Sequence, residues 1–315
     1  AENTVLGENA LDASVSGGSL TAVGFNALTA CTSGGTNTAI GRNVLTANTS
    51  GSTNTAVGSQ ALDANTTGSG NVAIGRNSLG ANISGASNVA VGAHALDSNT
   101  TASANVAVGL DALGGNTTGG SNTACGHKAL KSNTTGSSNT ALGSQVLMNT
   151  TASSNTAVGA FAMQNSTTGS HNTAVGLETL KSNQTGTNNA AFGAGALKNN
   201  TSSFNTGIGR HALENNTSGT KNTGVGNLAL LSNTTGSFNT SLGYDSLGDN
   251  TTGEKNVAVG SHSLLVNETG SNNTAVGEAA LNQNTASNNT TVGFESLKFN
   301  TTGANNVAVG ANALE

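Results

Sequence analysis

The chain has 315 residues, of which 8% are charged and 3% aromatic, and it contains no Pro and no Trp. This composition lacks both the bulky side chains of an ordinary globular core and the charge density of a disordered tail. A formal net charge of −5 at pH 7 gives no basic surface for nucleic acid, and no apolar run is long enough to insert into a membrane.

A segment of about seventeen residues recurs along the whole chain. Counted on the glycine of its NTAVG motif, it occurs nineteen times, at intervals of 17 residues in fifteen cases and 16 in three. A fixed period predicts an array whose units bury a core only by stacking on their neighbours. We therefore expect a single continuous domain over residues 1–315. The anchor glycines are Gly7, Gly24, Gly41, Gly58, Gly75, Gly92, Gly109, Gly126, Gly143, Gly159, Gly176, Gly193, Gly209, Gly226, Gly243, Gly260, Gly277, Gly293 and Gly310.

The copy at residues 54–70 reads NTAVGSQALDANTTGSG, and its elements follow in that order. NTAVG carries β-branched residues bounded by Asn and Gly, which predicts a strand. The array loses single residues around its NTTGS segment, which predicts a turn. Because seventeen residues cannot hold a helix pair, the expected fold is all-β. It is a parallel β-solenoid with one repeat per coil and two or three short strands in each coil.

Alternation along the strand predicts two faces with different environments. Thr55 and Val57 share one face, and we expect the row at Val57 and the row at Leu62 to fill the interior. Ala56 belongs to the other face, and its row stays small along the array. Either this row packs inside a narrow coil, or it contacts another copy of the chain. The small apolar area of one coil favours the second arrangement, so we predict an obligate homo-oligomer.

Asparagine recurs at two places in the repeat, at the start of NTAVG (Asn54) and before the turn (Asn65). Amides stacked at the ~4.8 Å spacing of coils can donate to one neighbour and accept from the other, which predicts asparagine ladders. The second row also forms N-x-S/T sequons, which an exporting cell could glycosylate if the amides pointed outward. These sequons begin at Asn48, Asn65, Asn82, Asn99, Asn116, Asn133, Asn149, Asn183, Asn216, Asn233, Asn250 and Asn300.

NTAVG followed by xxAL in tandem resembles the head repeats of YadA-type trimeric autotransporter adhesins. It is similar, too, to repeat arrays in bacteriophage tail fibres and bacterial surface fibres. The resemblance covers essentially the whole chain, although the NTTGS turn enlarges the repeat. It implies a left-handed parallel β-roll and a trimer around one axis, with Val and Ile filling the roll and the small residue (Ala56, Ala73) facing the axis. It also implies an extracellular or cell-surface location, or a place in a virion tail fibre.

No catalytic, cofactor-binding or metal site is predicted. The histidines lie in different positions or many coils apart, so no two can meet at the distances that zinc requires. Carboxylates are equally dispersed, and no pair recurs on adjacent coils as glycoside hydrolysis would need. We therefore expect no cofactor and no enzymatic activity. The histidines are His94, His127, His171, His211 and His262.

The two cysteines, Cys31 and Cys125, occupy different positions of the repeat and lie several coils apart. Their sulfur atoms are expected to be far beyond bonding distance. We therefore predict two free, packed thiols and no intrachain disulfide. The cysteines therefore do not indicate whether the chain works in an oxidising or a reducing compartment.

Two functional classes fit the array. The first is a structural or adhesive fibre that forms a stiff rod for surface attachment. Its partners would be further copies of the chain, as a homotrimer or a head-to-tail filament, and a surface or glycan receptor. Neither end departs in composition from the array, so we expect a fragment of a longer fibre or end-to-end stacking. The scattered aromatic residues that a receptor would contact are Phe25, Phe238, Tyr244 and Phe294.

The second class is an ice-binding solenoid, which would present a flat, regular array of exposed threonines. The paired turn threonines, such as Thr66 and Thr67, are candidates for that array. Their row is interrupted at Ile83, Gln184 and Glu268, and it lies in the turn whose length varies. The fibre is therefore the preferred interpretation, and ice binding is its alternative.

Overall fold

A computed structural model of the chain describes residues 2–314, within which all regular secondary structure is β-strand. The chain divides into two compact units, Ala1–Asn155 and Thr156–Glu315. Each unit is a parallel β-solenoid that advances by one coil every 16 or 17 residues. The predicted fold class is thus confirmed, whereas one continuous solenoid over residues 1–315 stays a prediction. Residues 2–314 include no helix long and apolar enough to cross a membrane.

Each strand in residues 2–314 is three residues long and begins directly after the first Asn position of the repeat. The first unit holds β1 (Thr4–Leu6), β2 (Thr21–Val23), β3 (Thr38–Ile40), β4 (Thr55–Val57), β5 (Val72–Ile74), β6 (Val89–Val91), β7 (Val106–Val108), β8 (Thr123–Cys125) and β9 (Thr140–Leu142). The second holds β10 (Thr156–Val158), β11 (Thr173–Val175), β12 (Ala190–Phe192), β13 (Thr206–Ile208), β14 (Thr223–Val225), β15 (Thr240–Leu242), β16 (Val257–Val259), β17 (Thr274–Val276), β18 (Thr290–Val292) and β19 (Val307–Val309).

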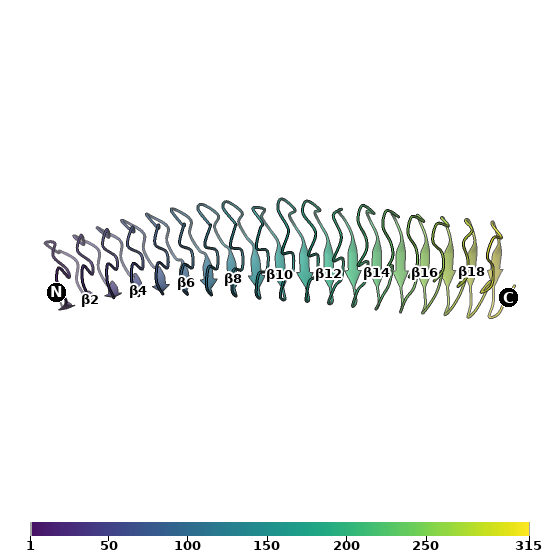
Figure 1. Cartoon of the computed structure of the whole chain (residues 1–315), viewed down its shortest axis with the longest axis horizontal. Helices are drawn as coiled ribbons and strands as arrows, with labels where there is room; N and C mark the ends of the chain where they lie inside the picture. Colours follow the sequence, from purple (N-terminus) through teal and green to yellow (C-terminus); the bar gives the residue numbers. More distant parts are fainter. Residues whose placement is uncertain (1, 315) are drawn as a thin grey trace. The chain divides into compact units, whose positions relative to one another are not determined.

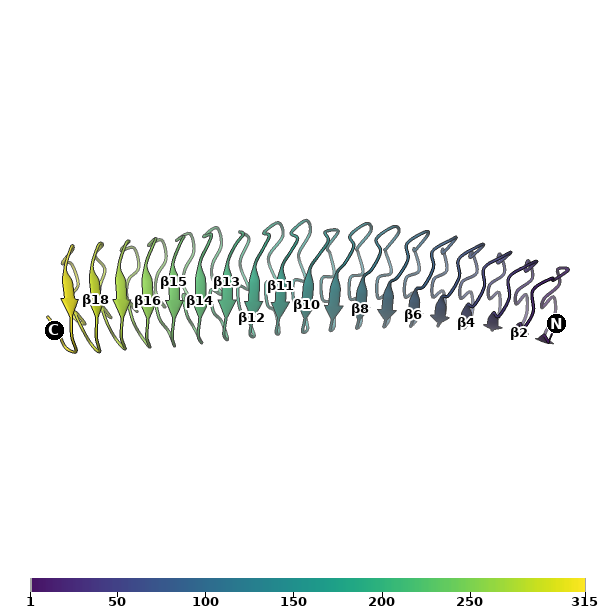
Figure 2. The same cartoon turned by 180° about the vertical axis from the view of Figure 1, so that it is seen from behind.

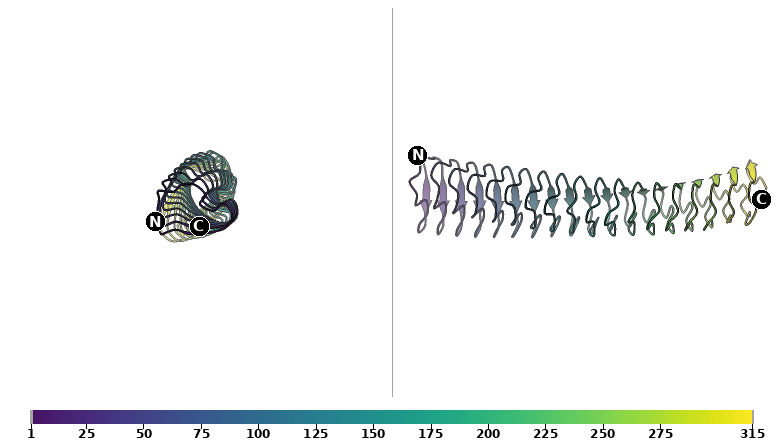
Figure 3. Two further views of the ribbon diagram at one scale, coloured as in Figure 1. Left: turned by 90° about the vertical axis from the view of Figure 1, so that its left-hand side faces the viewer. Right: turned by 90° about the horizontal axis from the view of Figure 1, so that it is seen from above.

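Neighbouring strands pair in parallel with equivalent repeat positions opposite each other. In the first unit Ala56 of β4 lies opposite Ala73 of β5, and the strands of each unit lie side by side along one wall (Figures 1 and 2). In the second unit Ala191 of β12 pairs with Gly207 of β13 although the interval is 16 residues. The deletion is therefore absorbed in the turn, and the strand register is unchanged. Successive coils of a unit accordingly stack over one another when seen end-on (Figure 3, left).

Each coil contains one strand, not the two or three that the sequence predicted. After the strand, Gln60 and Leu62 adopt φ angles of 59° and 50°, in the left-handed region that interrupts an extended chain. The walls without strands are nevertheless bonded from coil to coil. The backbone N–H of Leu62, for example, donates to the carbonyl of Ser78 in the next coil at 3.0 Å.

The interior of each coil is lined by the Ala row, so the predicted facing of the strand is wrong. Ala56 is fully buried, as its equivalents are in the internal coils, whereas Val57 is half-buried and Ile40 is 40% exposed. The leucine row is inside as predicted, with Leu62 fully buried. The small residues therefore pack within their own chain, and they do not form the contact with a second copy that we expected.

The inward row stays small because the two walls of a coil lie in contact. A Cβ atom at Gly207, in the Ala row, would lie 3.1 Å from Cγ of Leu197 and 3.2 Å from the carbonyl oxygen of Ala212. Little more than a methyl group fits between the walls. Where the row carries a hydroxyl group, that group can form a hydrogen bond across the gap. The hydroxyl groups of Ser241 and Ser246 are bonded in this way.

Both asparagine rows form buried ladders, as predicted. In the first row, Oδ1 of Asn54 accepts the backbone N–H of Asn71 at 2.9 Å, and Nδ2 of Asn54 donates to the carbonyl of Gly68 at 2.9 Å. In the second row, Nδ2 of Asn65 donates to Oδ1 of Asn48 at 2.8 Å and to Gly68 at 3.0 Å. Each amide therefore links one coil to the next and anchors a turn.

Candidate functional site

The outward side of the strands is the most uniform exposed surface of each unit. Because the central residue of a strand points inward, the first and third residues point outward, and we call these two rows the strand face. Its first position is Thr, Val or Ala, and its third is Val, Ile, Leu, Phe or Cys. No described strand places a charged residue in either row. The strand face is thus an uncharged strip on each unit.

The strand face is wholly aliphatic across three consecutive strands of the first unit. On β5, β6 and β7 both outward positions are Val or Ile. Ile74 is 40% exposed, Val106 36% and Val108 37%. Burying such surface is favourable at about 25 cal/mol per Å², so this patch favours contact with another apolar surface. Its members are Val72, Ile74, Val89, Val91, Val106 and Val108.

Charged side chains gather in two other rows, at the second and fifth residues after each anchor glycine. Within one coil these positions are three residues apart, and Glu178 pairs with Lys181 at 2.6 Å. Between adjacent coils they are twenty residues apart, and Glu178 also pairs with Lys198 at 2.8 Å. These pairs were not predicted, although their spacings of 3 and 20 residues can be read in the sequence. Further pairs are His94–Asp97, Asp111–Lys131, His211–Glu214 and Glu295–Lys298.

The environment of Glu178 stabilises its charged form. Hydrogen bonds from Lys181 and Lys198 lower the pKa of the Glu178 carboxyl to about 2, and the charges of the two lysines act in the same direction. The same contact with Glu178 raises the pKa of Lys198. Two coils of the second unit are therefore joined by ionised side chains as well as by backbone hydrogen bonds.

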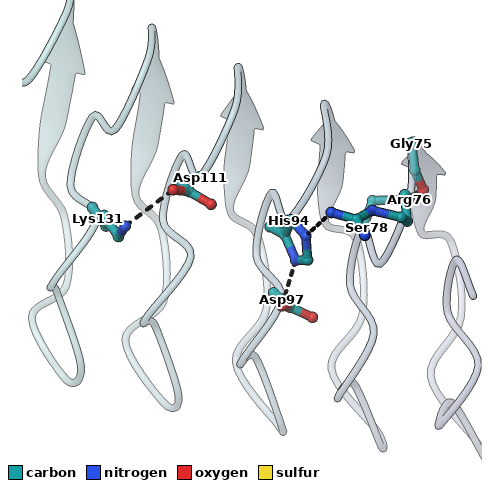
Figure 4. A network of polar contacts seen from close by, with 7 residues as sticks. All are labelled: Gly75, Arg76, Ser78, His94, Asp97, Asp111 and Lys131. Atoms are coloured by element: carbon teal, nitrogen blue, oxygen red, sulfur yellow. Dashed lines mark hydrogen bonds and ion pairs between the residues drawn. The ribbon is translucent and has the colours of Figure 1, made fainter.

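A polar network of the first unit (Figure 4) lies beside an open groove of about 470 Å³. Arg76 contacts Nε2 of His94 at 2.8 Å, and Nδ1 of His94 contacts Asp97 at 2.9 Å. On the adjacent coils, Lys131 bonds Asp111 at 3.0 Å. These side chains lie on the turn segments and away from the strands (Figure 4). From the sequence these side chains were expected to be dispersed, and the groove was not predicted.

Three of the other histidines make separate local contacts. His211 pairs with Glu214 at 2.7 Å, His171 contacts Ser170, and the ring of His262 packs edge-on against Tyr244 with centroids 5.2 Å apart. Residues 2–314 contain no group of three or more His, Cys, Asp or Glu side chains that could hold a metal ion.

The aromatic residues considered as receptor contacts are exposed but scattered. Phe25 is 41% exposed, Phe294 is 48% exposed, and each stands in a different coil. Tyr244 lies against His262, and the ammonium of Lys221 lies 4.9 Å from the ring centre of Phe238. No single aromatic platform is therefore formed by the residues singled out from the sequence.

Most sequon asparagines point inward. Asn48, Asn65 and Asn82 are fully buried, and the Nδ2 atom that would carry a glycan bonds neighbouring coils or turns. Of the twelve sequon asparagines named above, Asn149 and Asn300 are half-buried and the others are buried. Because a buried amide is inaccessible to a glycosylating enzyme, the ladder interpretation holds for the buried members of the row.

The two threonines of each turn pair differ in whether their hydroxyl groups are free to contact a ligand. The hydroxyl of Thr66 donates to the carbonyl of Ile83 in the next coil at 3.0 Å, and that of Thr234 does the same to Thr251. Thr67 and Thr235, the second members of these pairs, are exposed. The first threonine of these pairs therefore helps to join the coils and does not offer a free hydroxyl.

Both cysteines are free, as predicted, but the prediction that both are packed is wrong for Cys125. Cys31 is buried, its thiol donates to the carbonyl of Gly34 at 3.3 Å, and burial raises the pKa of this thiol. Cys125 is exposed at the outward end of β8, within the strand face. It is thus a natural chemical probe of that surface.

No protein-family model matches the chain, and no curated protein is significantly similar to it in sequence. Its function is therefore inferred from its own surfaces.

Proposed function

We propose that the chain is a structural, non-enzymatic fibre subunit, and that three copies associate through their strand faces. The observation that supports this most directly is the uncharged strand face, which carries an aliphatic, Phe or Cys residue at the third position of every described strand. A strand with one face in solvent ordinarily carries polar residues on that face. An unbroken uncharged row is explained when another surface covers it.

The size of the strand face suits association with a second copy. Strands spaced ~4.8 Å apart, with two outward residues each, give each unit a face of roughly 40 Å by 10 Å. Two such faces offer roughly 800 Å² per chain, the area that one partner buries in an interface of standard size, and in a trimer this area is shared between two neighbours. A second copy is the favoured occupant because it presents the same uncharged rows at the same spacing.

The stacked coils support a mechanical role. Backbone bonds such as Leu62 to Ser78, the two asparagine ladders and the ion pairs of Glu178 each join one coil to the next. We infer that the units provide stiffness and reach at a cell surface or on a virion, as the resemblance to adhesin heads and tail fibres implies. Attachment to a surface or glycan receptor belongs to the same proposal.

Light scattering tests the proposed assembly. The wild-type chain is expected to show three times its 30.5 kDa mass. Val91→Lys together with Val225→Lys places one charge on the strand face of each unit and is expected to give the mass of one chain. Thr67→Lys with Thr235→Lys adds the same charges on exposed turns and is expected to keep the wild-type mass. A wild-type monomer, or an oligomer that survives the strand-face pair, contradicts the proposal.

Ice binding is the second candidate function, and a different set of threonines supports it. The strand face exposes hydroxyl-bearing residues in runs, such as Thr38 and Thr55 on β3 and β4 and Thr123 and Thr140 on β8 and β9. Val72, Val89 and Val106 separate these runs. Thermal hysteresis of the purified protein tests this alternative. A value of zero excludes it, whereas a clear hysteresis gap in a monomeric sample would favour it over the fibre.

A further inference from the structure

The groove beside His94 owes its shape to two consecutive glycines. The residues that follow the buried leucine are Asp97 and Ser98 in one coil, Gly114 and Gly115 in the next, and Lys131 and Ser132 in the third. The coil in the middle therefore lacks both side chains at positions that its neighbours fill. The resulting groove of about 470 Å³ is lined by residues of all three coils, within the volume range of small-ligand sites.

The charges around the groove neutralise one another. A guanidinium group can only donate hydrogen bonds, so Nε2 of His94 accepts from Arg76 and the ring proton lies on Nδ1, where it is donated to Asp97. Neutral His94 thus connects one cation to one anion. Lys131 and Asp111 form a second balanced pair at 3.0 Å. The two cations balance the two carboxylates only when Arg76 is counted, which bonds His94 but does not itself line the groove.

The lining still offers several hydrogen-bonding groups to a ligand. Asp97 is 36% exposed and Lys131 is 43% exposed at their side chains, and each retains bonding capacity beyond its ion-pair contact. The hydroxyl residues Ser98, Ser132 and Thr134 line the same groove. Because Gly114 and Gly115 have no side chains, a flat ligand can approach the backbone of the groove closely.

We propose that this groove binds a neutral carbohydrate segment. Sugar hydroxyl groups both donate and accept, so they match a site that combines carboxylates, an ammonium group and hydroxyls without net charge. The proposal deepens the attachment role within the proposed function by giving it a location and a ligand class. It does not depend on self-association, because the lining residues lie outside the strand face.

Saturation-transfer NMR with cellobiose, maltotriose, lactose and N,N′-diacetylchitobiose at about 10 mM tests the proposal on the full chain. At least one of these sugars is expected to bind the wild type. Gly114→Gln is expected to weaken that binding at least about tenfold, because it fills the groove at a position where the neighbouring coils carry Asp97 and Lys131. Leu265→Gln introduces the same side chain at the equivalent position of the second unit, outside the groove, and is expected to leave binding unchanged.

Three outcomes would overturn the carbohydrate site. They are no binding by any of the four sugars, equal binding by the Gly114→Gln variant, and binding of glucuronate or glucosamine oligomers when the neutral sugars fail. Light scattering of Gly114→Gln separates this result from the assembly. The variant is expected to keep the wild-type mass. Loss of sugar binding by an intact oligomer is then due to the change in the groove and not to a change in assembly. Circular dichroism confirms that the variant is folded.

Discussion

The side-chain amide of Asn65 donates a hydrogen bond of 2.8 Å to the side-chain carbonyl of Asn48, seventeen residues earlier. Asn82 repeats this contact with Asn65 at 2.8 Å. In the first unit the ladder continues to Asn133, whose Oδ1 atom has no partner because Thr150 occupies the next position. The side-chain ladder of the first unit therefore ends in the coil where the array loses a residue.

Asn65→Ala is expected to destabilise the first unit by about 2–4 kcal/mol. It leaves Oδ1 of Asn48 without this donor and removes the acceptor of Asn82, and each buried group left unsatisfied costs about 1–3 kcal/mol. The free energy of unfolding in urea measures the effect. Thr67→Ala, on the exposed part of the same turn, is the control and should change stability by less than about 0.5 kcal/mol. Equal effects of the two substitutions would argue against the ladder as a source of stability.

Gly58→Ala is expected to cost about 3 kcal/mol or more. Gly58 has a φ of 133°, and a Cβ atom there would lie 2.6 Å from the carbonyl oxygen of Gly75. Gly70→Ala is the matched control, because φ is 69° and the nearest atom would lie 3.7 Å away. Its cost is expected to be about 1 kcal/mol. Thermal unfolding of both variants checks the order, and a milder effect at Gly58 than at Gly70 would refute it.

The two thiols are expected to react at different rates with a thiol reagent such as a maleimide. Cys125 is exposed and should be labelled in the folded chain, whereas Cys31 is buried with a raised pKa and should react only on unfolding. Mass spectrometry of labelled peptides distinguishes the two. If the strand face is covered by self-association, dilution below the association range should accelerate labelling of Cys125. Concentration-independent labelling of Cys125 would count against coverage of the face.

The pKa of Glu178 predicts a defined pH dependence. In the folded chain it is lowered to about 2 from an ordinary value of 4.5, so the stabilisation is present above pH 4.5 and is lost as the pH falls through about 2. Because the pair lies at the surface, Glu178→Gln is expected to cost no more than about 1 kcal/mol at neutral pH. That difference should vanish near pH 2 in urea unfolding. Glu268→Gln, in an exposed turn, is the control.

Residue patterns located the rows of the solenoid but could not assign all of them to the inside or the outside. Alternation showed that Ala56 and Val57 point to opposite sides of a strand, and this relationship holds in the structure. Which of the two points inward depends on the distance between the walls of a coil. A Cβ atom at position 207 would already contact Leu197, so the distance between the walls admits only a small residue. The sequence gives no direct measure of that distance.

The sequence by itself determined the period, the parallel stacking, the buried leucine row and the asparagine ladders. This was possible because the coils stack in register, which places each residue next to the equivalent residues of the adjacent coils. The neighbours of a residue can therefore be read from the repeat. Only the tertiary structure decided that the alanines are inside, that one strand suffices for a coil, and that Arg76, His94 and Asp97 meet beside Gly114. These features depend on the path that the chain takes around one coil. Backbone angles in the turns and contacts between the two walls of the coil set that path, and the length of the repeat specifies neither.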